Sequence, residues 1–208
     1  YAINKGAKVI NLSLGFYYVS GIYKMPLYFE GALQTAIDAA YANNICVVVA
    51  AGNGVETISN PPTFVRDVDL DDEKISPVCN DGNANKVIGV ANINNDTTKR
   101  YSSNYSSKFV DISAFGVNIW STYPDDTYAQ SSGTSMSAPA VSGIISLLLS
   151  YNPEMTPAQV MDYLRLTALN INQENPLYDG ELGAGLIQAD ELLAIYQSTT
   201  SSTLNNSQ

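Results

Sequence analysis

The sequence predicts a three-layer α/β/α domain built around a central parallel sheet. Two short apolar runs, residues 8–13 and 45–51, flank a segment whose apolar residues recur at helical spacing. This strand–helix–strand pattern is a βαβ unit, which requires parallel strands joined by a right-handed crossover. A long apolar segment after Gly133 predicts a further helix that covers the sheet. The chain has 208 residues, which suits one domain of this class.

The first elements can be assigned in chain order. Residues 1–6 are typical of the last turn of a helix that ends at Gly6. Residues 8–13 form a short buried strand. The next helix ends at Asn43 and Asn44, and its apolar positions are Ala32, Leu33, Ala36, Ile37 and Ala40. Residues 45–51 are continuously apolar, as expected of a strand that is buried on both faces.

Residues 55–85 have a different character and predict a long acidic surface loop. They contain Pro61-Pro62, a cluster of acidic residues and no apolar period. The acidic cluster predicts either a solvated loop or a cation site. A helix-loop-helix calcium motif is excluded, because Asp72 occupies the position that needs Gly and Val78 the position that needs Glu.

The later elements complete the three layers. Residues 87–91, 110–112 and 119–121 predict strands, and residues 133–149 predict a helix that is buried on most sides. A second helix begins with a capping box, in which Thr156 is the N-cap, Pro157 follows it and Gln159 completes the box. Leu192 and Leu193 suggest a short closing helix, and residues 198–208 predict a disordered tail.

Composition excludes several classes of function. The net charge of −10, with no run of Lys or Arg, argues against nucleic acid as a partner. No apolar run reaches the ~18–20 residues that cross a bilayer, so no membrane partner is expected. The chain has no histidine, and any mechanism that needs an imidazole cannot be completed by this chain alone. Its two cysteines cannot form a four-cysteine zinc site, and a bridge between Cys46 and Cys79 stays open.

The segment that begins at Gly133 carries the strongest chemical signal. Ser135 follows a glycine turn at the start of a buried helix, where its hydroxyl lies at the positive end of the helix dipole. Backbone N–H groups at that helix start can stabilise a developing oxyanion. The alternative from local pattern alone is an ordinary helix N-cap, since Ser and Thr are common there.

Three segments together resemble a known family. Gly133-Thr134-Ser135-Met136, followed by Pro139, resembles the nucleophile motif of the subtilases, the subtilisin-like serine proteases. Residues 47–53 (VVVAAGN) resemble the family's strand that ends in the oxyanion-hole asparagine, and residues 9–15 (VINLSLG) its substrate-channel strand. Weaker similarity continues at residues 87–91, 111–117 and 185–187. The resemblance spans roughly residues 1–196 and keeps the family's chain order.

The resemblance implies a role for each matched residue. Ser135 is the expected nucleophile, and Asn53 is expected to donate its side-chain amide to the oxyanion together with the Ser135 backbone N–H. On local pattern alone, Asn53 also fits a plain turn residue. The expected substrate-binding residues are Ser13, Leu14 and Gly15, which would pair with the substrate backbone, and Ala51 and Gly52, which would line part of the P1 pocket. No cofactor or metal site is expected in this chain, although calcium is expected in many full-length subtilase domains.

The family's catalytic aspartate and histidine are the main departure from the pattern. In a subtilase they precede the strand that begins here at Lys8, and their motifs are not in this chain. Residues 1–197 are therefore expected to be the C-terminal part of a subtilisin-like peptidase domain that lacks its N-terminal strands. The expected partners are a polypeptide substrate and the missing N-terminal half, in cis or in trans, and the expected location is extracellular or at the cell surface. The alternatives are an inactive peptide-binding module and one half of a split protease.

Overall fold

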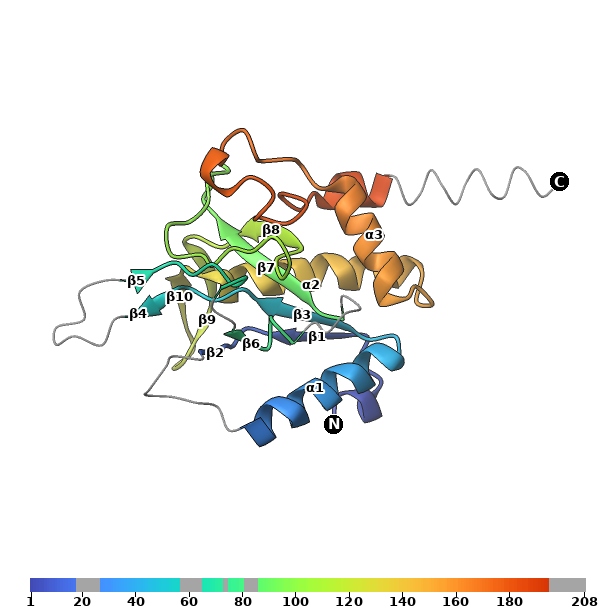
Figure 1. The fold of residues 1–208 in the computed structure, drawn as a ribbon. Helices are drawn as coiled ribbons and strands as arrows, with labels where there is room; N and C mark the ends of the chain where they lie inside the picture. Colours follow the sequence, from blue (N-terminus) through green and yellow to red (C-terminus); the bar gives the residue numbers. More distant parts are fainter. Residues whose placement is uncertain (18–26, 57–64, 73–74, 81–85, 195–208) are drawn as a thin grey trace.

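A four-stranded, fully parallel sheet forms the centre of the computed structural model (Figure 1). The structure describes residues 1–17, 27–56, 65–72, 75–80 and 86–194. The sheet has the order β1-β3-β7-β8. The strand bounds are β1 Val9–Leu12, β3 Cys46–Ala50, β7 Ile88–Ile93 and β8 Ile112–Phe115. The predicted parallel sheet is thereby confirmed.

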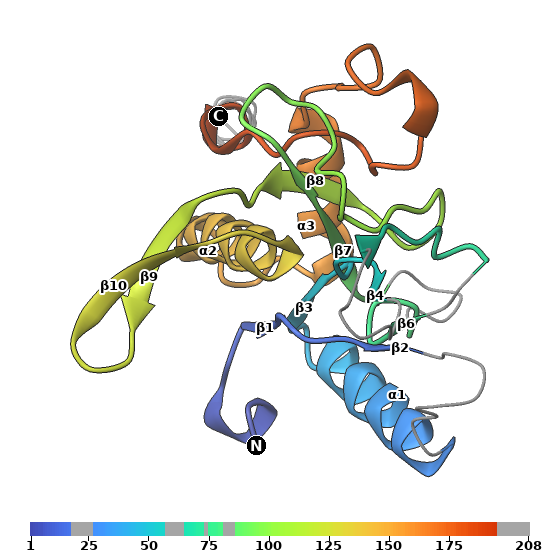
Figure 2. The same cartoon turned by 90° about the vertical axis from the view of Figure 1, so that its left-hand side faces the viewer.

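Helices cover both faces of this sheet. Helix α1 (Leu27–Ala42) and helix α2 (Thr134–Tyr151) lie on opposite faces (Figure 2). Helix α2 contacts all four strands of the sheet. Helix α3 (Pro157–Thr167) begins with the predicted capping box, in which Thr156 and Gln159 bond each other's backbone. The arrangement confirms the three-layer α/β/α class.

Helix α2 is the core helix of the domain. It is long and apolar enough to cross a membrane by length and composition, and no other helix among the described residues meets that criterion. The sequence-based expectation of no such segment was therefore wrong. Its apolar residues instead pack on the sheet, with Val141, Ile145 and Leu148 fully buried. The opposite side of the helix is exposed, contrary to the prediction of burial on most sides. The exposed residues are Pro139, Ala140, Gly143, Ser146, Leu147, Ser150 and Tyr151.

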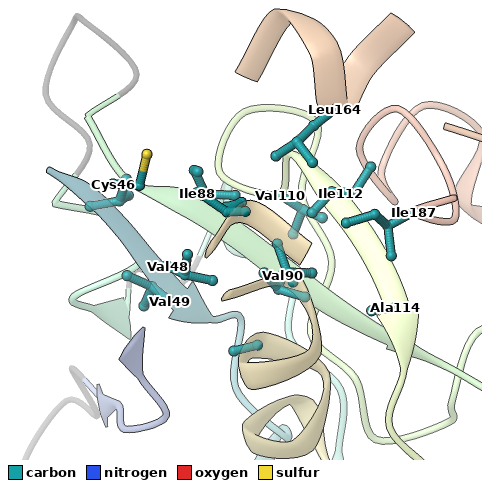
Figure 3. Packing of buried hydrophobic residues seen from close by; sticks show 14 of the residues in the cluster. Cys46, Val48, Val49, Ile88, Val90, Val110, Ile112, Ala114, Leu164 and Ile187 are labelled. Atoms are coloured by element: carbon teal, nitrogen blue, oxygen red, sulfur yellow. The ribbon is translucent and has the colours of Figure 1, made fainter. Parts of the chain in front are cut away.

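The hydrophobic core lies between the sheet and its helices. Side chains from β3, β7 and β8 meet there, together with Leu164 of α3 (Figure 3). Every residue of β3 is buried, as expected of a central parallel strand. Cys46 belongs to this cluster, and burial raises the pKa of its thiol to about 12. No disulfide joins Cys46 to Cys79 among the described residues.

Parts of the region 55–85 are buried, contrary to the prediction of a surface loop, whereas Asp72 is exposed as predicted. Val68, Leu70, Ile75 and Val78 are buried in the core. The segment around Val68 is held by distant backbone, because Tyr105 N–H donates to Val68 O at 3.2 Å and Leu70 N–H donates to Tyr105 O at 2.9 Å. Such long-range pairing leaves no local period in the sequence. Three two-residue strands also lie here: β4 (Val55–Glu56), β5 (Val65–Arg66) and β6 (Ile75–Ser76), which pairs with β2 (Phe16–Tyr17).

Two 3-10 turns, a two-stranded hairpin and a short helical segment complete the described chain. A 3-10 turn (Ile3–Lys5) ends at Gly6, as predicted, with Gly6 in the left-handed conformation. The predicted strand at 119–121 is β9 (Ile119–Tyr123), and its partner β10 (Thr127–Ser131) was not predicted. Together they form a hairpin that projects from the body of the molecule (Figure 2). A second 3-10 turn spans Pro176–Tyr178, and residues 189–194 are helical. The predicted tail, residues 198–208, lies outside the described residues.

Candidate active site

The three matched segments converge at one edge of the sheet. Ser13 directly follows β1, Asn53 follows β3, and Ser135 lies in the first turn of α2. The carboxyl ends of parallel strands meet at a common edge, which is where α/β folds of this kind place their ligands. Residues separated by 122 positions in the chain are in direct contact here.

Asn53 is held against the start of α2 through its side-chain oxygen. The Asn53 Oδ1 atom accepts a hydrogen bond from the Thr134 backbone N–H at 2.8 Å and one from the Thr134 hydroxyl at 3.1 Å. The Thr134 hydroxyl oxygen also accepts a bond from the Gly52 N–H at 3.1 Å. Because an amide side chain has one oxygen and one NH₂ group, this arrangement leaves the Asn53 NH₂ group as its donor side.

Ser135 is half-buried and contacts Ser13 on the neighbouring segment. The Ser13 hydroxyl donates to the Ser135 carbonyl oxygen at 2.9 Å, and the Ser135 hydroxyl donates to the Ser13 carbonyl oxygen at 3.4 Å. The Ser135 N–H lies in the first helical turn, where backbone N–H groups have no acceptor within the helix. The Ser135 hydroxyl oxygen therefore lies beside a helix N-terminus, and its hydrogen-bond acceptor is the Ser13 carbonyl.

The turn that presents Ser135 rests on Gly116. The Gly133 N–H donates to Gly116 O at 2.8 Å, and the Ser137 hydroxyl donates to Ala114 O at 3.0 Å. A Cβ atom at Gly116 would overlap the Ser137 hydroxyl and lie 2.6 Å from Gly133 O. The close packing at this point explains why a residue without a side chain is needed beneath the turn.

The other predicted substrate-binding residues differ in exposure. Leu14 is 45% exposed, and Gly15 is exposed at the rim next to Ile75. Gly52 is half-buried, whereas Ala51 is fully buried, and its N–H donates to Val90 O at 2.9 Å. Of the two residues expected in the P1 pocket, Gly52 alone offers accessible surface.

Two further residues shape the site and were not identified from the sequence. Thr134 holds the Asn53 oxygen, and Asn104 bonds the backbone on both sides of Asn53. Thr134 lies within the matched motif, so its position next to Ser135 could have identified it as a residue of the site. Asn104 lies in a polar run without period or motif, and only the folded chain brings it to the site.

The acidic residues of the predicted loop contact protein groups in the structure. Asp67 pairs with Lys99 at 2.6 Å, and Asp71 accepts bonds at 2.6 Å from the hydroxyls of Ser106 and Ser107. Burial raises the pKa of Asp71, but these hydrogen bonds outweigh it and leave the pKa below its ordinary value. No group of three or more acidic, His or Cys side chains is placed to hold a metal within the described part of the chain.

Comparison with known proteins decides the family. A sequence model of the Subtilase family matches residues 1–185. The chain belongs to the subtilase family. The family predicted from the three motifs is thus confirmed, and the matched region of this subtilase includes Ser13, Asn53 and Ser135.

Similar proteins include named subtilisins. Subtilisin BL of Lederbergia lenta is 32% identical over 191 residues, which cover 91% of this subtilase chain and 58% of the relative. Subtilisin-like protease 1 of Plasmodium falciparum (isolate 3D7) is 34% identical over 171 residues, covering 79% of this chain and 23% of that protein. The chain thus spans between about a quarter and three fifths of the length of these relatives.

Solved structures agree on the fold of this subtilase. A protease from Pseudoalteromonas arctica superposes with a TM-score of 0.67 at 29% identity, over 91% of this chain and 51% of that chain. The prenylagaramide maturation protease PagA superposes with a TM-score of 0.69, over 93% of this chain and 63% of that chain. At 24% identity, the second likeness concerns the fold alone.

Proposed function

We propose that this chain is the serine-bearing part of a subtilisin-like serine endopeptidase that cleaves polypeptides. The observation that carries the proposal is the contact between Asn53 and the start of α2. Its side-chain oxygen is engaged by Thr134, which leaves its amide to donate beside Ser135. A helix N-terminus, a serine hydroxyl and an amide donor at one sheet edge are the groups that acyl transfer needs.

The proposed reaction has two stages. In the first, Ser135 Oγ attacks the carbonyl carbon of the scissile peptide bond, and its proton passes to a base. The Asn53 amide and the Ser135 N–H donate to the oxyanion while the C–N bond breaks, and the amine leaves with the proton. In the second stage, water attacks the ester and releases the new carboxyl end from Ser135. The residues after β1 pair with the substrate backbone as an added strand.

The base is expected from polypeptide outside residues 1–208, since the chain contains no histidine. The edge of β1 supports this proposal, because among the described residues β1 pairs only with β3. The side of α2 that faces away from the sheet also exposes Leu147 and Tyr151. Parallel sheets are normally covered on both faces, so a strand along β1 with a helix against α2 would complete the domain. We expect the completed enzyme outside the cell or at its surface.

The second candidate is a peptide-binding module without turnover. One contact favours it: the Ser135 hydroxyl donates to the Ser13 carbonyl at 3.4 Å, and the chain contains no histidine to act as a base. A serine without a general base is a poor nucleophile. In this reading, the segment after β1 would hold a peptide without cleaving it.

The deciding experiment begins with the coding DNA upstream of Tyr1. A reading frame with an Asp-Ser/Thr-Gly strand end and a His-Gly-Thr helix start would be joined to residues 1–208 and assayed on a fluorogenic peptide. We expect turnover from the joined protein, none from residues 1–208 alone, and none from the joined Ser135→Ala variant. Turnover by residues 1–208 alone would contradict the proposed missing base. A joined protein that binds peptide but does not cleave it would favour the peptide-binding module.

A further inference from the structure

Asn104 is a fully buried polar residue in the segment that follows β7. Its Nδ2 atom donates to Ala51 O at 2.8 Å, and its Oδ1 atom accepts from the Gly54 N–H at 2.9 Å. The same oxygen accepts from the Val68 N–H at 3.0 Å, and the Asn104 backbone N–H donates to Gly52 O at 3.0 Å. One residue thus supplies four hydrogen bonds, and three of them go to the segment that carries Asn53.

The segment around Asn53 has no regular structure of its own to hold it. It follows the end of β3, and both Gly52 and Gly54 have a positive φ, at 95° and 83°. Because residues 51–54 lie outside any helix or strand, their buried N–H and C=O groups need hydrogen-bond partners from other parts of the chain. Those hydrogen bonds hold the segment in one conformation. Asn104 supplies them on both sides of Asn53, to Ala51 and Gly52 before it and to Gly54 after it.

The chemistry of the position selects an amide. The site needs a donor toward Ala51 O and an oxygen that accepts from two N–H groups, which an amide side chain provides. An aspartate keeps the acceptor and loses the donor, and an alanine loses both. If Asn104 is shortened to alanine, the buried Ala51 carbonyl and Gly54 N–H lose their hydrogen-bond partner and are still kept from water. This is unfavourable, so the substitution favours local opening of the segment.

We infer that Asn104 is a positioning residue for the oxyanion hole, which holds residues 51–54 so that the Asn53 amide faces the reacting carbonyl. This inference rests on the proposed role of Asn53. Asn104 acts through Asn53 and touches no reacting atom. It also joins the segment 67–70 to the site, because Val68 and Gly54 share its side-chain oxygen.

The first test measures amide hydrogen exchange on residues 1–208, and it needs no activity. In Asn104→Ala, we expect exchange of the Gly54 amide to rise by about tenfold or more, with a parallel rise at the Thr134 amide that bonds Asn53. Asn104→Asp should give a smaller rise at Gly54, because the acceptor is kept. The matched control is Asn175→Ala, since Asn175 is 4% exposed and bonds Lys99 N, Thr97 O and Ile171 O.

The second test is kinetic and uses residues 1–208 joined to their Asp- and His-bearing segment. We expect Asn104→Ala to lower kcat by about tenfold or more with little change in KM, since the loss affects the transition state. In the Asn53→Ala background, Asn104→Ala should lower kcat almost no further. A merely structural role would instead lower activity by a similar factor in both backgrounds.

The outcomes separate this inference from the proposed function. If no joined form has activity, the proposed function fails, and the exchange measurement still decides the role of Asn104. If Asn104→Ala does not fold, native-state exchange of the unmutated chain decides it: the Gly54, Val68 and Asn104 amides must open together. Separate opening, or equal protection of Gly54 in Asn104→Ala and the unmutated chain, would overturn the inference.

Discussion

One oxygen of Asn53 accepts two hydrogen bonds from Thr134, from the backbone N–H at 2.8 Å and from the hydroxyl at 3.1 Å. The two residues are 81 positions apart in the chain and join the end of β3 to the start of α2. The bonds fix which end of the amide is the acceptor, and so determine which end is the donor. The same helix start therefore orients the Asn53 amide and carries Ser135.

Loss of the Thr134 hydroxyl should loosen Asn53. In the joined protein, we expect Thr134→Val to lower kcat about tenfold with KM nearly unchanged, because one of two bonds to Asn53 is lost. The free energy of unfolding should also fall by about 1–3 kcal/mol, because the Gly52 N–H loses its acceptor. Steady-state kinetics and urea denaturation measure the two effects. Thr167→Val is the control, since its hydroxyl bonds Tyr163 O within α3, away from Asn53. Equal kcat losses in both variants would contradict the role of Thr134.

Removal of the Asn53 amide should affect the chemical step itself. In subtilisin, a member of the same family, loss of the oxyanion asparagine costs about 10²–10³ in kcat, and we expect that order for Asn53→Ala in the joined protein. KM should change little, since the donor acts on the charge that develops in the transition state. Single-turnover acylation of Ser135 is the measurement. A kcat within twofold of the unmutated enzyme would remove Asn53 from the mechanism.

A methyl group beneath the turn that carries Ser135 should displace that turn. Gly116→Ala would place a Cβ atom against the Ser137 hydroxyl and Gly133 O, and both belong to the turn that carries Ser135. Over-packing of this kind typically costs about 1–3 kcal/mol, and activity should fall with stability. Thermal and urea unfolding give the energy.

Helix α2 offers a matched glycine with the opposite expectation. A Cβ atom at Gly143 would meet nothing within 4 Å, because the residue lies on the exposed side of the helix. In residues 1–208 alone, Gly143→Ala should stabilise the chain by up to about 1 kcal/mol through helix propensity, as urea unfolding would measure. Destabilisation of residues 1–208 would contradict the exposed position of Gly143, whereas destabilisation of the joined protein alone would indicate the proposed helix against α2.

Stability at high pH should depend on Tyr178. Burial, followed by the charge of Asp67, raises the pKa of Tyr178 from 10.0 to about 12, and its hydroxyl donates to Asp67 at 3.1 Å. Between pH 10 and 12, the unfolded chain releases this proton while the folded chain keeps it, so the stability it contributes is lost as pH rises through that window. Tyr178→Phe should lose less stability from pH 10 to 12 than the unmutated chain. Urea midpoints at each pH measure this, with exposed Tyr101→Phe as control; parallel curves for Tyr178→Phe and the unmutated chain would contradict it.

The sequence predicted elements whose signal is local. The continuous apolar run of β3 and the Thr156 capping box both appear where expected. The burial of Val68 and Leu70 was missed, because charged residues surround them and their partner is the backbone of Tyr105. Strand β10 was missed because Thr127–Ser131 is polar and pairs within an exposed hairpin. Asn104 was missed because its four hydrogen bonds go to backbone groups that are distant in the sequence, and such bonds produce no local sequence pattern.

Helix α2 also governs when this chain can fold during synthesis. The strand β1 is translated before α2, and its contacts with α2 must wait until more than a hundred further residues have left the ribosome, as the Ser13–Ser135 separation of 122 shows. Pairings this distant make folding slow, because the loop entropy is lost before the contacts form. In the meantime, the apolar side chains of β1 and β3 are exposed, because helix α2 does not yet cover them. The nascent chain is thus most vulnerable to aggregation in the interval before helix α2 is synthesised.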